Sequence, residues 1–171
     1  LRFRNLKKNK NIFKMNILAY KKINFTRIHH QDPMKKGNYL LTQTFYKFNN
    51  DNIPILIQTP KLKTDIGIVN NESRSYIEFN IDESQREFYD FLYRIDELNI
   101  SITHQNSNSW FEQNLPLDII DDLYISPIKV NKVTNKPVFK LKVPIYKTKK
   151  GCEVFSNQKI PIDILNIKKI A

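Results

Sequence analysis

Short stretches of strand-forming residues, separated by turn residues, recur along most of this chain and limit the folds open to it. Among its 171 residues only three are glycine, and none of them lies in a glycine-rich motif that cradles phosphates. Strand-length runs at this spacing are typical of an antiparallel barrel or sandwich. We therefore predict a mainly β protein with strands near 23–29, 38–48, 53–59, 76–81, 125–133, 138–145 and 160–167.

Two of these runs alternate between apolar and polar residues, as half-buried strands do. In the fourth run, Phe79 lies on the apolar face, and Tyr76 and Glu78 lie on the opposite face. In the sixth run, Lys140 and Lys142 project together, about 7 Å apart at the usual strand rise. This separation is close to the phosphate spacing of an extended single strand of nucleic acid.

One longer stretch has helical spacing instead. Asp82 and Gln85 match a capping box, and large apolar residues then recur at helical intervals, which predicts an inserted helix over 82–98. A second, shorter helix is expected over 117–124, with polar, turn-prone residues between the two. The acids on the other side of the first helix indicate a solvated face: Glu83, Glu87, Asp90 and Glu97.

Charge is distributed in blocks along the sequence. Residues 1–36 carry 11 Lys or Arg against one acid and residues 123–171 carry 11 against two, whereas 82–122 carries ten acids against two bases. Separate blocks of like charge can hold a polyanion, and neutralised phosphates release counterions on binding. A nucleic acid is therefore the first partner to consider. The plainer alternative is that the basic flanks are solvated surface.

Size and composition indicate one soluble domain, which we expect over 16–171 after a basic flexible arm at 1–15. No apolar run reaches the length of a signal peptide or a membrane span. Cys152 is the only cysteine, which excludes an internal disulfide and a cysteine-based zinc site. We expect a protein that is not secreted and works in a reducing compartment.

No combination of residues predicts catalysis. The three histidines lack metal-ligand spacing. Asp118, Asp121 and Asp122 with Glu112 are the residue types that hold Mg²⁺ in nucleases, but adjacent acids on a short helix usually face water. We expect no enzyme activity, no metal and no cofactor. A Mg²⁺-dependent nuclease is kept as an alternative.

Lysines interleaved with aromatic residues suit a single-strand groove, because every base has a flat face that stacks on an aromatic ring for ~1–3 kcal/mol while lysines follow the backbone. For any one aromatic residue, packing in the core is the more common role. We predict nucleic-acid contacts by Lys61, Lys63, Tyr76, Trp110, Lys129, Lys132, Lys140 and Lys142.

Six segments follow one another along the chain in an order that can be compared with known families: IPILIQTPKLKTDIGI, SYIEFNI, a helix ending FLYRIDE, NSWF, YISPIK and PVFKLKVPIY. In this order, over about 38–167, the chain resembles the single-stranded DNA-binding proteins of nucleocytoplasmic large DNA viruses. Those proteins are similar to the single-stranded DNA-binding proteins of podovirus-type phages. The chain departs from the phage pattern at its end, where NIKKIA stands in place of an acidic tail.

The resemblance implies an OB-fold-like antiparallel barrel with an inserted helix. It also implies sequence-independent binding of single-stranded DNA in viral DNA replication, recombination and repair, with replication proteins as partners and the host cytoplasm or the virion as location. A linear plasmid is another suitable host element. The matching positions in this chain are Gln58, Thr59, Pro60, Lys61, Gly67, Trp110, Phe111, Lys129, Lys140 and Lys142.

Two other partners stay open at this point. A basic structural nucleoprotein or virion component that binds duplex DNA needs the lysines but no exposed aromatic residues. RNA is the other alternative, because an OB surface accepts both polymers and the sequence shows no specific reader of the 2′-hydroxyl. The oligomeric state cannot be read from the sequence.

Overall fold

The computed structural model describes residues 17–37, 39–71, 74–144 and 153–162, and the predicted arm at 1–15 lies outside them. The chain divides into two compact units, and the domain predicted over 16–171 spans both. We name them by their described residues: the sheet unit (61–71, 74–84, 127–144 and 153–162) and the helix unit (17–37, 39–60 and 85–126).

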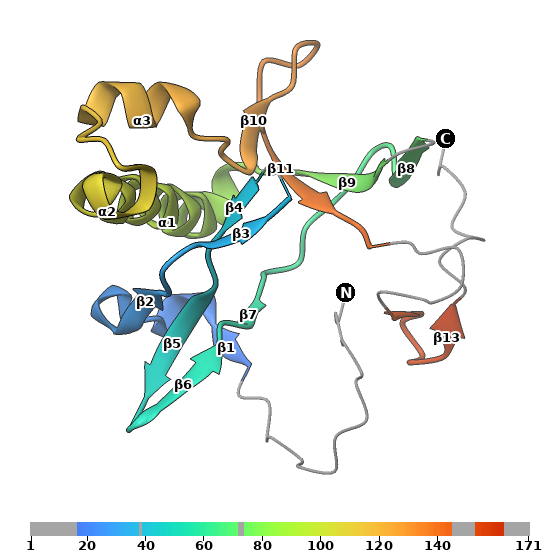
Figure 1. Ribbon diagram of the computed structural model, residues 1–171. Coiled ribbons are helices and arrows are strands. Elements are labelled where there is room, and N and C mark those ends of the chain that lie inside the picture. Colours follow the sequence, from blue (N-terminus) through green and yellow to red (C-terminus); the bar gives the residue numbers. More distant parts are fainter. Residues whose placement is uncertain (1–16, 38, 72–73, 145–152, 163–171) are drawn as a thin grey trace. The chain divides into compact units, whose positions relative to one another are not determined.

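The sheet unit contains a four-stranded antiparallel sheet with the order β10-β11-β9-β8 (Figure 1). Its central strands β9 and β11 pair so that Phe79 is opposite Phe139. A separate hairpin joins the two short strands near the end of the described chain. The strands are β8 (Ile68–Asn71), β9 (Arg74–Asn80), β10 (Ile128–Val130), β11 (Pro137–Lys142), β12 (Val154–Phe155) and β13 (Pro161–Ile162).

The alternation predicted for β9 and β11 is confirmed by burial. Ile77, Phe79 and Phe139 are at most 8% exposed, whereas Glu78 and Lys140, which follow or precede them in the chain, are half-buried. Successive side chains of a strand point to opposite faces, so one face of this sheet is apolar and the other carries the charges together with Val138, which is only 3% exposed.

The helix unit holds three small sheets. One is antiparallel with the order β2-β5-β6, the second pairs β3 with β4, and the third pairs β1 with β7 in parallel. Two 3-10 turns, η1 and η2, lie between β1 and β2. Bounds are β1 (Leu18–Ala19), η1 (Tyr20–Lys22), η2 (Phe25–Arg27), β2 (Ile28–His30), β3 (Met34–Lys36), β4 (Tyr39–Leu41), β5 (Thr44–Phe48), β6 (Asp51–Pro54) and β7 (Ile57–Gln58).

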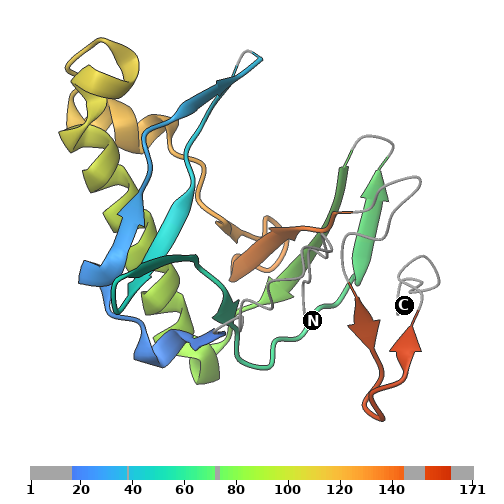
Figure 2. The same cartoon turned by 60° about the horizontal axis from the view of Figure 1, so that its bottom comes forward.

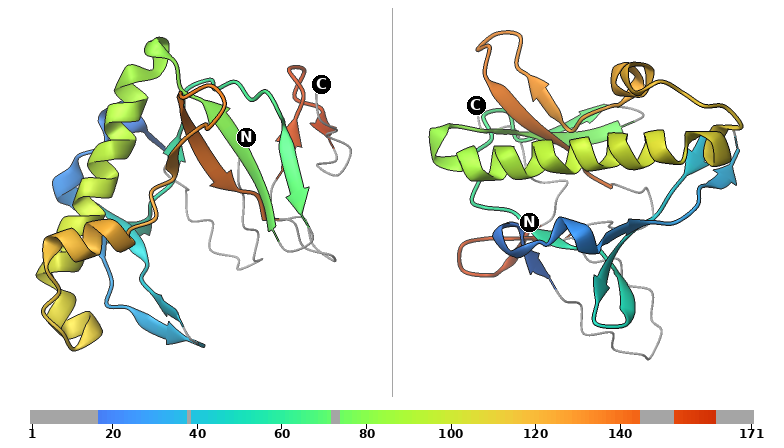
Figure 3. Two further views of the ribbon diagram at one scale, coloured as in Figure 1. Left: turned by 90° about the horizontal axis from the view of Figure 1, so that it is seen from above. Right: turned by 90° about the vertical axis from the view of Figure 1, so that its left-hand side faces the viewer.

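The longest element of the helix unit is α1 (Arg86–Gln105), the long helix of Figure 2, which is seen at full length in Figure 3. Its apolar stripe buries Phe88, Phe91 and Leu92, as the helical spacing predicts. The helix begins at residue 86 and not at 82, because Asp82 instead accepts hydrogen bonds from the backbone and hydroxyl of Ser84 at the 3-10 turn η3 (Glu83–Gln85).

Beyond residue 98 the prediction of turn-prone chain was wrong. α1 continues to Gln105, and α2 (Ser107–Phe111) follows it. Polar side chains in this stretch bond to helix carbonyls instead of competing with the helix: Thr103 Oγ1 donates to Asn99 over 2.7 Å, and Asn106 Nδ2 donates to Ile102 over 2.8 Å. The short helix predicted at 117–124 is confirmed as α3 (Leu117–Leu123).

The expected mainly β class with an inserted helix is confirmed, since α1, α2 and α3 lie in sequence between β9 and β10. The described strands form five sheets, none of which closes into a barrel, an arrangement compatible with an OB-like fold. The run predicted at 23–29 is strand only from Ile28, because Asn24 caps the 3-10 turn η2. No helix in the described part of the chain is long and apolar enough to cross a membrane.

Candidate nucleic-acid interface

The polar face of the four-stranded sheet brings Tyr76 and two predicted lysines together. Residues directly opposite one another in antiparallel strands point to the same face. Lys142 on β11 is opposite Tyr76 on β9, and Lys140 is opposite Glu78. The strand pairing therefore places a tyrosine, an acid and two lysines next to one another.

The same face extends to both neighbours of this strand pair. On one side, Lys129 of β10 is opposite Val138 of β11. On the other side, Lys63 forms a bridge with Asn80 at the end of β9. We call the predicted residues on this surface the lysine face: Lys63, Tyr76, Lys129, Lys140 and Lys142.

Lys140 is already engaged within the lysine face. Its Nζ lies 2.9 Å from Glu78 Oε1 and 3.6 Å from the centroid of the Tyr76 ring. A cation over an aromatic face is attracted by the ring quadrupole, so Tyr76, Glu78 and Lys140 hold one another in place. A base that stacks on this side of the Tyr76 ring would have to replace the ammonium group.

The remaining lysines of the face are exposed, and among the described residues Lys63, Lys129 and Lys142 form no ion pair. Acids do gather near Lys63. Hydrogen bonds from Ser84 lower the pKa of Asp82, and the charge of Lys63 contributes to the same shift. Lys129 and Lys142, on β10 and β11, therefore carry the freer positive charge of the face.

Two further predicted lysines belong to the sheet unit but not to its strands. Lys61 is exposed and precedes Lys63 by two residues. Lys132 is exposed in the turn between β10 and β11, where Asn131 Oδ1 accepts hydrogen bonds from the backbone of Val133 and Thr134 over 2.9 and 3.1 Å. Both lysines can add charge near the sheet without belonging to the lysine face.

Trp110, the other predicted stacking residue, lies in the helix unit on α2. Its side chain is half-buried, and its indole Nε1–H donates to Asp32 Oδ1 over 3.3 Å. A carboxylate beside the ring disfavours a phosphate there. These contacts suit a tryptophan that packs within the helix unit.

A chain of hydrogen bonds joins three parts of the helix unit. From β2, His30 Nε2 donates to Asn99 Oδ1 over 2.9 Å, and Asn99 Nδ2 donates to the Tyr124 hydroxyl over 2.9 Å. Tyr124 and Ser126 then donate to the two carboxylate oxygens of Asp96 over 2.8 and 2.6 Å. Asp96 is only 6% exposed, so its charge is stabilised by these hydroxyl groups.

Burial raises the pKa of Tyr124 to about 12, and the neighbouring Asp96 charge acts in the same direction. The Tyr124 phenol therefore stays protonated and continues to donate to Asp96. Local sequence patterns did not predict this network. Its signal is the position of Asp96, four residues after Leu92 and eight after Phe88 on the buried stripe of α1.

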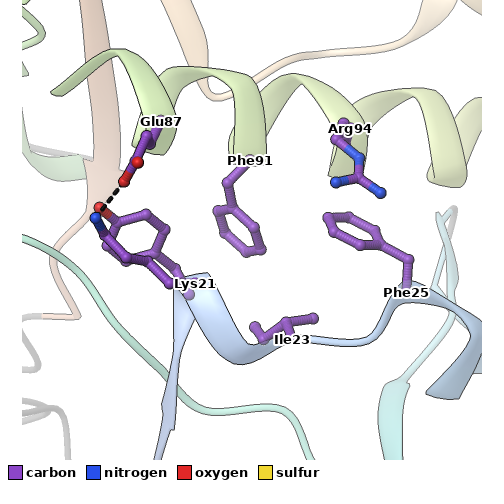
Figure 4. Close-up of a pocket in the computed structure, with 7 residues that line it drawn as sticks. Lys21, Ile23, Phe25, Glu87, Phe91 and Arg94 are labelled. Carbon is purple, nitrogen blue, oxygen red and sulfur yellow. Dashed lines mark ion pairs between the residues drawn. The ribbon is translucent and has the colours of Figure 1, made fainter.

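A pocket of about 240 Å³ lies in the helix unit between α1 and the segment of η1 and η2 (Figure 4). The sequence analysis also missed this site, although aromatic and basic residues interleave from Tyr20 to Arg27. Its lining residues are Tyr20, Lys21, Ile23, Phe25, Glu87, Phe91 and Arg94.

The acids of the central segment give no metal site. Asp118, Asp121 and Asp122 are exposed on α3, and Glu112 is exposed after α2. Among the described residues, no group of three or more His, Cys, Asp or Glu side chains is arranged to hold a metal ion.

Comparison of the chain with protein families, with curated proteins and with solved structures finds no match.

Proposed function

We propose that this protein binds single-stranded DNA without sequence preference, through the lysine face of the sheet unit. The observation that carries the proposal is the register of β9, β10 and β11, which places Lys129, Lys140 and Lys142 on the same face as Tyr76, with Lys142 directly opposite it. From residue 127 to 144 the chain has five lysines and no acid. Lysines on one sheet face attract phosphates, and release of counterions favours the complex.

Tyr76 favours a single strand over a duplex. In a duplex the bases are stacked on one another, whereas in a single strand a base is free to stack on an aromatic side chain. Tyr76 is half-buried and already has a cation against its ring. On binding, a base would take the place of the Lys140 ammonium group, which then becomes free to contact a phosphate.

The double variant Lys129→Gln and Lys142→Gln tests the proposal. Both side chains are exposed, so the change leaves the fold intact and removes two cations from the lysine face. We expect roughly tenfold weaker binding of a fluorescent thirty-nucleotide strand, at ~0.2–1 kcal/mol per exposed charge contact. The dependence of log K on log salt should become shallower by about 1.4, at ~0.7 per phosphate of a single strand.

The matched control is the double variant Lys35→Gln and Lys47→Gln. These lysines are also exposed, but they lie on β3 and β5 of the helix unit. If both double variants weaken binding equally, only total charge matters and the lysine face is not the binding surface.

A further inference from the structure

The pocket of the helix unit combines an aromatic lining with a guanidinium group that has no acidic partner. The rings of Tyr20 and Phe25 each lie 5.8 Å, centroid to centroid, from the ring of Phe91. The Arg94 guanidinium lies 4.1 Å above the centroid of Phe25, as Figure 4 shows. Arg94 is exposed and forms no ion pair among the described residues.

The size of the pocket limits what it can hold. Pockets for drug-sized ligands occupy ~300–1,000 Å³, and this one is about 240 Å³. It therefore suits a single ring or another small fragment. Phe25 and Arg94 lie against each other and both line the pocket with Phe91, so a flat group in the pocket can contact aromatic rings and the guanidinium group together.

The charges around the pocket favour a ligand that carries phosphate. Glu87 forms an ion pair with Lys21, and Asp90 pairs with Arg86 over 3.1 Å, so both acids of the first turns of α1 are neutralised. The cations of η1, η2 and α1 that form no ion pair among the described residues are Lys22, Arg27 and Arg94, and all three are exposed.

One nearby acid acts in the opposite direction. Glu97 is exposed on α1, three residues after Arg94, and the two side chains form no ion pair. Removal of its charge by Glu97→Gln should therefore strengthen binding of an anionic ligand at Arg94.

We propose that this pocket holds one unstacked base of a bound single strand, which packs against the aromatic rings and the Arg94 guanidinium of the lining while its phosphate lies near Arg94, Lys22 and Arg27. This second contact rests on the proposed function and deepens it. Guanidinium planes and aromatic rings are the groups on which splayed bases stack in single-strand complexes. The site adds recognition of base faces in a unit that lacks the lysine face.

Arg94→Ala and Arg94→Lys, measured against Arg86→Ala, test the stacking role. Arg86 is an exposed arginine on the same helix but outside the pocket. We expect Arg94→Ala to weaken binding of the thirty-nucleotide strand about fivefold or more, as loss of one stacked base does. Arg94→Lys should keep the salt dependence of the intact protein and yet lose most of the affinity, because an ammonium group has no plane. Equal affinities of Arg94→Ala and Arg86→Ala would overturn the inference.

Photo-crosslinking distinguishes a DNA contact at the pocket of the helix unit from binding at the sheet unit alone. A thirty-nucleotide strand that carries 5-iododeoxyuridine is bound to the intact protein and irradiated, and the crosslinked peptides are identified by mass spectrometry. We expect crosslinks to Tyr20 or Phe25. If the strand binds but crosslinks form only in the sheet unit, the pocket inference fails and the proposed function stands. If the intact protein does not bind the strand at all, the proposed function fails as well.

Discussion

The sheet unit and the helix unit differ in where they place charged groups. Within the described residues the sheet unit has nine Lys or Arg against five acids, and the helix unit has eight against ten. The four-stranded sheet of the sheet unit carries Lys129, Lys140 and Lys142 on one face, with Lys140 and Glu78 paired beside Tyr76. The helix unit instead buries a carboxylate, Asp96, under two hydroxyl groups. Charge on a surface is available to a partner, whereas charge in a core fixes the positions of its neighbours.

The largest expected effect is the loss of stability when the buried Asp96 of the helix unit is replaced. Asp96→Ala leaves the hydroxyl groups of Tyr124 and Ser126 without their acceptor. We expect a loss of about 3 kcal/mol in the free energy of unfolding, because hydrogen bonds to a charged group are worth ~1.5–3 kcal/mol each. Urea unfolding measures the loss, and Asp96→Asn, which keeps one acceptor oxygen, should lose less. An equally stable Asp96→Ala variant would show that the network does not hold the helix unit together.

The second largest expected effect is the loss of stability in Trp110→Ala. Trp110 is half-buried and donates to Asp32, so we expect a loss of about 2 kcal/mol, below the ~3–5 kcal/mol of a fully buried tryptophan. Affinity for single-stranded DNA, measured on the folded fraction, should not change. A variant that melts like the intact protein but binds DNA several-fold more weakly would restore the stacking role that the sequence analysis gave to Trp110.

The pH dependence of stability gives a smaller effect. The pKa of Tyr124 is about 12 in the folded chain against an ordinary value of 10.0. The unfolded chain therefore loses this proton first, and the stabilisation from the protonated phenol, complete below pH 10, is lost as the pH rises from 10 to 12. The stability difference between the intact protein and Tyr124→Phe should shrink over this interval. A difference that stays constant would mean that the phenol titrates normally.

The smallest expected effect is a gain in DNA affinity when an acid is removed from the lysine face. Glu78→Gln removes the acid that pairs with Lys140 and lies on the same face as Tyr76. The pair is half-buried, and even an exposed ion pair is worth ~0.2–1 kcal/mol, so we expect affinity for single-stranded DNA to rise about twofold. Glu83→Gln removes an exposed acid outside the strands and serves as the control. A lower affinity of Glu78→Gln would mean that Glu78 positions Lys140 for binding.

The spacing of apolar residues in the sequence correctly predicted the elements that bury one face, namely β9, β11 and α1. The alternation in β9 and β11 identified the apolar face through Phe79 and Phe139, and helical spacing identified the stripe of α1. These patterns work because burial acts on every second, or every third and fourth, side chain. The shared face of Lys140 and Lys142 followed from the same period.

Other features depend on residues that are distant in the sequence. The placement of Lys129 and Lys63 on the same face as Tyr76 comes from strand order, which local patterns do not determine. The helical stretch after residue 98 was missed because its Thr and Asn side chains, usually turn formers, bond back to helix carbonyls. The pocket and the Asp96 network were missed because their residues come from separate segments that only the fold brings together.

Competition between single-stranded and duplex DNA tests whether the protein prefers a single strand. A labelled thirty-nucleotide strand is bound to the intact protein and titrated, at several salt concentrations, with unlabelled single strand, with duplex and with RNA. We predict binding that weakens with salt and that unlabelled single strand displaces far better than duplex at equal nucleotide concentration. Displacement by duplex as strong as that by the single strand would contradict the account, and a basic structural nucleoprotein would then be the better description.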